Sequence, residues 1–290
     1  MERLEVLVVD AFADEPTGGR QVAVLPNGDG CSEIQRRAVA DELGAAGTVT
    51  GTPDGLAYVG ADAPGTVIEG AVAGVGALVD AAGESLTVTA DDRELEIEVT
   101  DEGMPWVETA RMDVGSASVE EARVASALGI DVAAVRDVAA DLPVGKAAGG
   151  GGSLLVPVNF LEHLGRVDPD AGALSTLLED VGARRAVAFS FDTLRADTDI
   201  HTRVLDPAVR GDEQPTGALG VAACGPHLVG NGVFDGERTE IRIECGHFLD
   251  RPATITATLD SQPQVTGPAV TAVDGTISVP ADSDDEILEV

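Results

Sequence analysis

Residues 70–82 read Gly-Ala-Val-Ala-Gly-Val-Gly-Ala-Leu-Val-Asp-Ala-Ala, and their first charged side chain is that of Asp80. The stretch predicts a helix whose side chains are small or apolar on every face. A helix without a polar face has to be surrounded on all sides by other parts of the protein. Since the protein carries enough charge to be soluble, we expect a curved sheet or barrel of strands to wrap around this helix.

A second stretch of the same character, Thr216–Cys224, reads Thr-Gly-Ala-Leu-Gly-Val-Ala-Ala-Cys, and its start resembles that of the first. We interpret the two stretches as central helices of two homologous halves, each with a strand that leads into a glycine-started apolar helix. The 290 residues also fit two domains of roughly 150 residues each. We place the boundary near 112–117, which gives domains at 1–115 and 116–290, with the last strand able to return to the first domain.

The rest of the chain predicts many short strands and a few helices, which is an α+β pattern. A helix is expected at 32–43, with Ser32 as its N-cap and Gly44 after its end, and others at 118–128 and 169–181. The expected strands are 4–9, 21–25, 56–59, 66–69, 85–89, 94–99, 106–110, 153–158, 185–190, 200–205, 232–234, 239–245, 252–259 and 269–279. The polar tail 282–286 is expected to fray.

The chain is strongly acidic, with 51 acidic against 18 basic residues, a net charge of −33 and Lys146 as its single lysine. On a surface of roughly 11,500 Å² the excess charges lie roughly 19 Å apart. That spacing is shorter than the Debye length of about 30 Å at 0.01 M salt and much longer than the length of about 3 Å at 1 M. Together with 3% aromatic residues, this composition is typical of a protein from a salt-in halophile. An acidic surface for one basic partner is the alternative, and the spread of acidic residues along the whole chain disfavours it.

The composition also bears on partners and cofactors. Neutralising nucleic-acid phosphates, or an anionic membrane surface, needs clustered Lys and Arg, so neither partner is expected. No apolar run is long enough to span a membrane, and the start carries no basic and apolar signal segment, so we expect a cytoplasmic protein. Cys31, Cys224 and Cys245 are too few for a disulfide framework and show no C-x-x-C spacing of the kind that binds metals. The four histidines are scattered and form no metal-ligand pattern. We therefore expect no cofactor and no metal.

The two glycine-started helices predict a binding site. Unpaired N–H groups at a helix start attract a carboxylate or an oxyanion. Gly70 and Gly217 mark the two expected starts, and Asp212 and Glu213 precede the second as candidates for a general acid or base. Acidic residues before a helix also simply favour its dipole, so a purely structural role for them stays open.

Several motifs in order along the chain resemble those of one known family. Val9–Gly19 reads V-D-A-F-A-D-E-P-T-G-G, and His201–Pro207 followed by Asp212–Ala218 reads H-T-R-V-L-D-P and D-E-Q-P-T-G-A. Glu244–His247 reads E-C-G-H, Arg251–Ala253 reads R-P-A, and Val265–Val270 reads V-T-G-P-A-V. These segments resemble the D-A-F…G-G-N-P, R-x-F-x-P, E-D-P-A-T-G-S, Q-G, G-R-P-S and V-x-G-x-A-V elements of the PhzF-like phenazine-biosynthesis family.

The resemblance implies the diaminopimelate-epimerase-like fold, in which two pseudo-symmetric domains each wrap strands around a central helix, with a site in the cleft between them. Family members with known activity are cofactor-free isomerases that move a proton within a small carboxylate, commonly as homodimers. The residues that this implies for binding the substrate are those of the first loop and of the two helix starts: Gly18, Gly19, Gly70, Ala71, Thr216, Gly217 and Ala218.

The chain departs from the family at residues that carry the chemistry. The principal acid/base of the family is the glutamate of an N-L-S-E-T stretch, and Gly47 stands at that position here. Ala71 replaces the histidine of G-H-A-T, and Arg20 replaces the asparagine of G-N-P. The second-domain carboxylate remains as Glu213, with Asp212 beside it. Neither Cys31 nor Cys224 stands at a helix start, as a thiol acid/base would require.

Two functions fit these observations. The first is an isomerase or epimerase with altered catalytic residues that uses Glu213 or Asp212, with Glu42 or Glu69 as candidates for the missing partner. The second is a catalytically inactive homologue that binds a small metabolite, or a dimeric binding protein. His201 and Arg203 are candidates to contact a carboxylate, although ion pairing of Arg203 with an acidic residue is an equal alternative. His247 is expected to be a packed loop histidine.

The charge argument predicts a salt requirement for folding. We expect the melting temperature to rise between about 0.05 M and about 3 M KCl, because the shorter Debye length removes self-repulsion among the acidic residues. Thermal melts followed by circular dichroism measure this. An unchanged melting temperature would contradict the interpretation of the acidity as an adaptation to salt.

Overall fold

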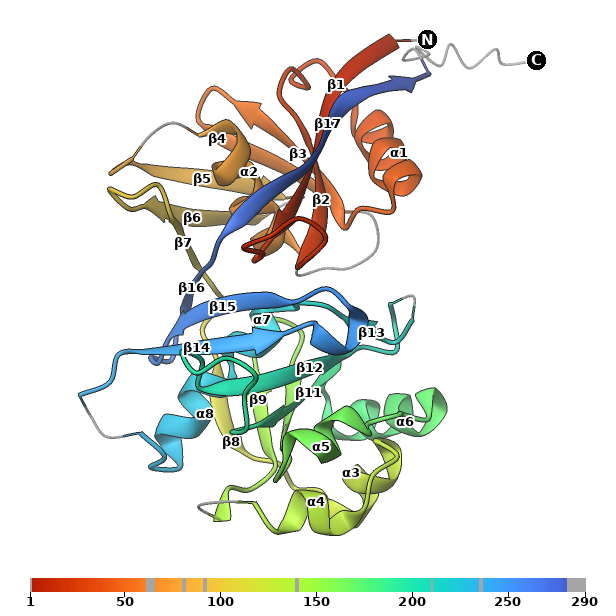
Figure 1. Cartoon of the computed structure of the whole chain (residues 1–290), viewed down its shortest axis with the longest axis vertical. Helices are drawn as coiled ribbons and strands as arrows, with labels where there is room; N and C mark the ends of the chain where they lie inside the picture. Colours follow the sequence, from red (N-terminus) through yellow and green to blue (C-terminus); the bar gives the residue numbers. More distant parts are fainter. Residues whose placement is uncertain are drawn as a thin grey trace.

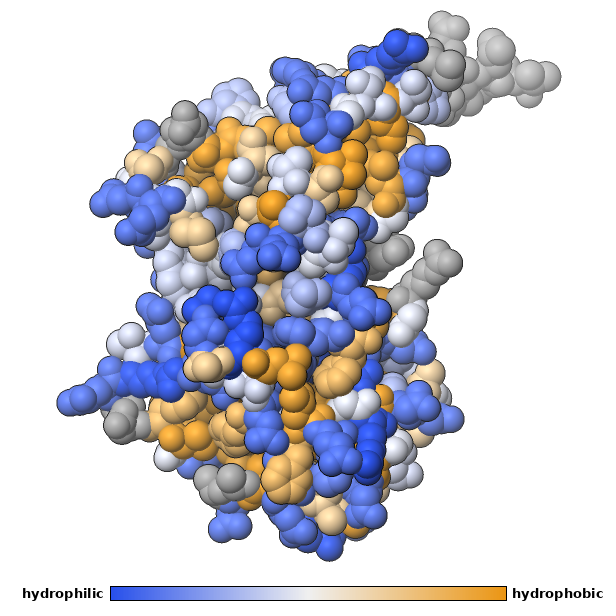
Figure 2. Space-filling view, viewed as in Figure 1, coloured by the Kyte–Doolittle hydropathy of each residue, from blue (hydrophilic) through white to orange (hydrophobic). Residues whose placement is uncertain are grey.

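The computed structural model describes residues 2–60, 66–79, 82–90, 93–138, 141–209, 211–234 and 237–280. Figure 1 shows two lobes stacked along the long axis of the molecule. The space-filling view narrows where the lobes meet, and hydrophilic residues cover much of the outline of both (Figure 2). The predicted frayed tail at 282–286 lies outside the described residues. No helix in the described ranges has both the length and the apolar character needed to cross a membrane.

The upper lobe holds the first part of the chain and one late strand. Its strands are β1 (Glu2–Ala11), β2 (Arg20–Leu25), β3 (Gly47–Thr52), β4 (Gly55–Gly60), β5 (Ser85–Ala90), β6 (Arg93–Val99), β7 (Pro105–Glu108) and β17 (Ala269–Val279), and its helices are α1 (Glu33–Leu43) and α2 (Val67–Leu78). The late strand β17 runs back from the lower lobe and lies antiparallel to β1, from Ala11 opposite Ala269 to Glu2 opposite Val279 (Figure 1).

The lower lobe holds the remaining elements. Its strands are β8 (Asp113–Ser116), β9 (Gly145–Ala148), β10 (Ser153–Pro157), β11 (Arg185–Ser190), β12 (Ile200–Leu205), β13 (Glu213–Gln214), β14 (Glu240–Cys245), β15 (Ala253–Thr258) and β16 (Gln264–Thr266). Its helices are α3 (Glu121–Ala127), α4 (Val132–Arg136), α5 (Leu161–Gly165), α6 (Ala171–Val181), α7 (Ala218–Ala222) and α8 (Cys224–Gly230), with the 3₁₀ turn η2 at His247–Leu249.

The strands of both lobes belong to one mixed sheet. Across the described residues 17 strands are linked by hydrogen bonds, and the pairing of β7 with β16 joins the two lobes. The pairs β2–β3, β4–β5, β10–β11 and β12–β14 are parallel, and the others are antiparallel. The sheet does not close, so of the two predicted forms, a curved sheet or a barrel, the barrel is wrong.

The apolar helix α2 is enclosed, as its sequence predicts. It contacts strands β1, β2, β3, β4, β5, β7 and β17, and residues Ala71–Ala73 are 0% exposed. It begins at Val67 rather than at Gly70, so the expected strand at 66–69 is wrong. The β-branched Thr66, Val67 and Ile68 favour a strand locally. Burial against the surrounding strands outweighs that weak local preference.

The second apolar helix is also buried, but it is shorter than predicted. Gly217 has a φ of 76°, and α7 starts directly after it and ends at Ala222, before α8 begins at Cys224. α7 contacts β11, β12, β15 and β16, and it also touches α2 of the other lobe. One buried apolar cluster contains residues of both α2 and α7, so the two lobes share part of their core.

Other local expectations have mixed outcomes. The predicted start of α1 is confirmed, because the side chain of Ser32 accepts from the N–H of Gln35 in a capping box, and Gly44 ends the helix with a φ of 63°. The expected strand at 232–234 is wrong, since Gly232 follows α8 in a turn. Strand β3 was not predicted, because its sequence Gly-Thr-Val-Thr-Gly-Thr carries two glycines.

The glycine at position 70 supplies a test of how tightly α2 is enclosed. Ala is a better helix former than Gly by about 1 kcal/mol, so helix propensity alone predicts that Gly70→Ala stabilises the protein. A Cβ at this position would lie 2.3 Å from Cδ2 of Tyr58, however. We expect a loss of about 1–3 kcal/mol in the free energy of unfolding. Gly230→Ala, in a helical position with nothing within 4 Å, is the control and should be neutral or slightly stabilising.

Candidate active site

The two lobes meet where α2 and α7 begin, and a buried carboxylate joins them there. Oε1 of Glu69, in the first turn of α2, accepts hydrogen bonds from Oγ1 of Thr216 at 2.8 Å, from the N–H of Gly217 at 3.2 Å and from the N–H of Ala218 at 3.1 Å. The side chain of Glu69 is 0% exposed. The structure thus brings together the two segments that the sequence singled out.

This contact corrects part of the predicted site. The N–H groups of Gly217 and Ala218 were expected to be unpaired, but Glu69 already occupies them. Gly70 lies one turn inside α2, where its N–H donates to the carbonyl of Thr66, and Ala71 is completely buried. The expectation of open N–H groups at both helix starts is therefore wrong. The first helix begins at Val67, before Gly70, and the N–H groups at the start of the second helix already donate to Glu69.

A pocket of about 420 Å³ lies beside this junction and is lined by both lobes. The upper lobe contributes residues at the start of β2 and the end of α1, and the lower lobe contributes the segment around β13 and the loop before β15. The lining residues are Arg20, Gln21, Ala40, Asp41, Gly44, Ala45, Val209, Glu213, Pro215 and Arg251. Two arginines and two carboxylates thus face one space between the lobes.

The two arginines of this pocket differ in their partners. Arg251 binds the upper lobe, since its Nε donates to the carbonyl of Gly19 at 2.8 Å and its Nη2 to Oδ1 of the buried Asp10 at 2.6 Å. Nη2 also donates to the carbonyl of Gly18. The guanidinium of Arg20 forms no hydrogen bond or ion pair with another described residue, so its charge is available to a ligand.

The carboxylates differ in the same way. Glu213 is 9% exposed and receives a two-point contact from Arg203, with Nε at 2.9 Å and Nη2 at 2.6 Å from its oxygens. Arg203 is itself held by the carbonyls of Leu164 and Val167. Of the two roles expected for Arg203, contact with a carboxylate ligand or ion pairing with an acidic residue, the structure shows the ion pair. Asp41 is exposed in the last turn of α1.

The other predicted acid/base, Asp212, does not line this pocket. It has a φ of 58° in a turn, where its N–H donates to the carbonyl of Val209 and its carbonyl accepts from the N–H of Asp206. Asp41 was missed, because in the sequence it is one of many acidic residues on a helix. Only the pocket, which the end of α1 lines together with residues of the other lobe, distinguishes it.

Gly18 and Gly19 belong to the first loop, and their carbonyls accept hydrogen bonds from Arg251. The N–H of Gly19 donates to the carbonyl of Pro252, and Gly18 lines a separate pocket of about 270 Å³. Residues Asp14–Thr17 of the upper lobe also line it, together with Arg195, His247 and Pro252–Thr254 of the lower lobe. The first-loop glycines therefore hold the lobes together through their backbone.

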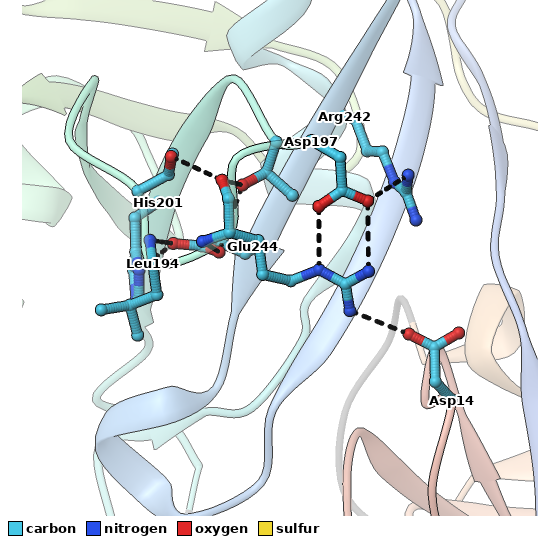
Figure 3. Close-up of polar contacts among 9 residues, drawn as sticks. Asp14, Leu194, Asp197, His201, Arg242 and Glu244 are labelled. Carbon is cyan, nitrogen blue, oxygen red and sulfur yellow. Dashed lines mark hydrogen bonds and ion pairs between the residues drawn. The ribbon is translucent and has the colours of Figure 1, made fainter.

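A buried cluster supports the lower-lobe side of this second pocket (Figure 3). Glu244 accepts from Nδ1 of His201 at 2.7 Å and from the N–H groups of Leu194 and Arg195. Burial raises the pKa of Glu244, but the bonds from His201 and the backbone outweigh it and leave the pKa lowered. Asp14 of the upper lobe accepts from Nη1 of Arg195 at 3.1 Å, and Asp197 accepts from Nε of the same arginine at 3.1 Å.

Tyr58 occupies the space beside Gly47. A Cβ at Gly47 would lie 2.4 Å from the hydroxyl oxygen of Tyr58. That hydroxyl contacts the carbonyl of Ala46 at 2.9 Å and Oγ1 of Thr66 at 2.6 Å. Burial raises the pKa of Tyr58, so the phenol stays protonated and cannot serve as a base near neutral pH.

The thiols and histidines lie outside the pocket of about 420 Å³. Cys224 and Cys245 are buried, and burial raises the pKa of both thiols. His247 lines the second pocket, and burial lowers its pKa. Among the described residues, no three His, Cys, Asp or Glu side chains gather closely enough to hold a metal ion.

The chain is similar in fold to several solved structures. A PhzF-family phenazine biosynthesis protein from Bacillus anthracis has a TM-score of 0.79 at 18% identity, over 96% of this chain and 100% of that chain. A predicted epimerase from Pseudomonas aeruginosa has a TM-score of 0.73 at 19% identity, over 96% and 100%. A hydroxyproline epimerase from Agrobacterium vitis has a TM-score of 0.54 at 13% identity, over 96% and 91%.

None of the curated proteins compared with the chain matches it. The family model for phenazine biosynthesis-like proteins, PhzC-PhzF, matches residues 77–275, which is more than half of the chain. This match shows that the chain belongs to the PhzC-PhzF family.

Proposed function

We propose that the protein is a cofactor-independent isomerase that moves a proton within a small carboxylate metabolite. The pocket between the lobes carries this proposal, because it combines two arginines with two carboxylates. The arginines would hold the anionic group of the substrate, and the carboxylates would remove and return the proton. Membership of the PhzC-PhzF family supports the same class of reaction.

The charge of the protein makes the two arginines significant. With a net charge of −33, most of the surface repels a small anion. Arg20 and Arg251 are two of the 18 basic residues, and both line this one pocket. Arg20 stands where the resembling motif has asparagine, so this departure adds a cation to the pocket. We therefore infer that the substrate or ligand is a carboxylate.

Glu213 and Asp41 are the residues we propose for proton transfer. The oxygens of Glu213 accept bonds from Arg203 but each has a second lone pair, so the carboxylate can still accept a proton from a substrate in the pocket. Asp41 comes from the other lobe and would act on the opposite side of the substrate. Asp212 remains an alternative only if its turn rearranges.

Several wider features remain part of this proposal. They are two pseudo-symmetric domains at 1–115 and 116–290 with the last strand returning to the first domain, a homodimer, and a location in the cytoplasm of a cell with high internal salt. The repeated sequence plan and the acidic composition support the first and the last of these.

The second candidate is a family member that binds a small carboxylate without converting it. Gly47 in place of the family's glutamate favours it, and Tyr58 fills the space that such a side chain would need. The two candidates share the ligand class and the pocket, and they differ in whether Glu213 and Asp41 exchange a proton with the ligand.

Proton exchange in D₂O at high salt tests the enzyme directly. We expect deuterium to enter the carbon adjacent to the carboxylate of an accepted small acid, detected by NMR. Glu213→Gln and Asp41→Asn should each slow the exchange by about 100-fold or more, since each removes an acid/base. Glu42, the other acid/base candidate on α1, is exposed and does not line the pocket, so Glu42→Gln should have no effect. Binding of acids without any exchange in the wild-type protein would favour the silent binder.

Substitution of Arg20 tests the proposed ligand contact separately from the chemistry. Arg20→Ala should weaken the binding of a small carboxylate by about 10-fold or more, because a charge-assisted hydrogen bond is lost. Arg37→Ala makes the same change in charge on the exposed face of α1, where Arg37 pairs with Glu33, and should leave affinity unchanged. Equal affinity of wild type and Arg20→Ala in calorimetry would remove this pocket as the binding site.

The space at Gly47 also gives a prediction. Gly47→Glu alone should destabilise the protein by about 1–3 kcal/mol, because the new side chain meets the ring of Tyr58. The paired variant Gly47→Glu with Tyr58→Ala should be less destabilised than the two single changes added together. Chemical denaturation of the four proteins measures this coupling, and simple additivity would show that Tyr58 is not the obstacle.

A further inference from the structure

Glu69 makes the most unusual contact in the molecule outside the pocket of the proposed reaction. It lies in α2 of the upper lobe, and all three of its donors lie in residues 216–218 of the lower lobe. These donors bind a single oxygen, Oε1. The other oxygen, Oε2, is buried and has no hydrogen-bond partner among the described residues.

Within the described part of the chain, the three donors bond to no acceptor other than Oε1 of Glu69. Thr216 and Ala218 are 0% exposed, and Gly217 is buried between them. Buried N–H and O–H groups without a partner are costly, and a carboxylate is a stronger acceptor than a neutral group. Because the acceptor comes from the other lobe, satisfying these groups requires the lobes to be together.

We propose that Glu69 is the chain's own ligand for the carboxylate-binding donors at 216–218, and that it holds the two lobes closed and excludes external carboxylates from these donors. This role goes beyond the proposed function and does not depend on it, since it concerns closure of the lobes and not proton transfer. An added carboxylate would then find the 216–218 donors open only when the side chain of Glu69 has been removed.

The chemistry of the side chain supplies a matched probe. Glu69→Ala removes the terminal CH₂–COO⁻ group, which has the size and charge of acetate. Glu69→Gln keeps a carbonyl oxygen in the place of Oε1, and puts the amide nitrogen where Oε2 has no partner. The first variant therefore opens a space for acetate at the donors, and the second leaves that space filled with a neutral acceptor.

Thermal melts at constant high potassium, with acetate replacing chloride, test the proposal. We expect Glu69→Ala to lower the melting temperature by roughly 5–10 °C in chloride, and acetate to raise it again with increasing concentration. The wild-type protein and Glu69→Gln should show no such recovery. Small-angle X-ray scattering should show a larger radius of gyration for Glu69→Ala in chloride than in acetate.

A second substitution covers the case in which Glu69→Ala does not fold. Thr216→Val removes one of the three donors and keeps the shape of the side chain, so it should lower the melting temperature of the wild type by roughly 2–4 °C. In the Glu69→Gln background, Thr216→Val should not change the melting temperature if Thr216 requires a charged acceptor. If the amide oxygen of Gln still accepts the bond, Thr216→Val should lower the melting temperature by less than it does in the wild type. A recovery in acetate that is equal in wild type and Glu69→Ala, or an undiminished effect of Thr216→Val in Glu69→Gln, would overturn the proposal.

Discussion

The contact between Glu69 and residues 216–218 is the interaction on which the arrangement of the lobes depends. Each of its partners is buried, so water cannot replace a missing bond at this position. The contact also lies where the apolar helices α2 and α7 touch, in a core cluster shared by both lobes. The pocket beside it exists in its present shape because α1 and β13 are brought to the same side of this junction.

Two of the chain's arginines form ion pairs that join the two lobes. Arg251 connects the lower lobe to Asp10 and to the glycines of the first loop, and Arg195 reaches Asp14 across the same boundary. In a protein with a net charge of −33, such contacts offset part of the repulsion between two acidic lobes. The exposed pair of Arg195 and Asp14 is weakened by salt, whereas the buried bonds of Glu69 are screened much less.

Tyr58 connects two glycine positions of the upper lobe. A Cβ at either Gly47 or Gly70 would lie within 2.5 Å of the Tyr58 side chain, so the same side chain restricts both positions to glycine. Glu69 adds a carboxylate to the same region, but its oxygen is directed to the donors of the other lobe. The charged residues that line the pocket between the lobes are Arg20, Arg251, Asp41 and Glu213, and the proposed chemistry rests on these residues.

The sequence alone determined the enclosed helix at α2, the capped helix α1, most strands and the family, because these depend on local periodicity and on motifs in order along the chain. It did not determine where α2 starts, since the β-branched residues 66–68 favour a strand until they are buried. The pairing of Glu69 with residues 216–218, and the selection of Asp41 among many acidic residues, depend on which surfaces face each other. Only the tertiary structure decided these, because hydrogen bonds and pockets between lobes join residues that are more than a hundred positions apart in the chain.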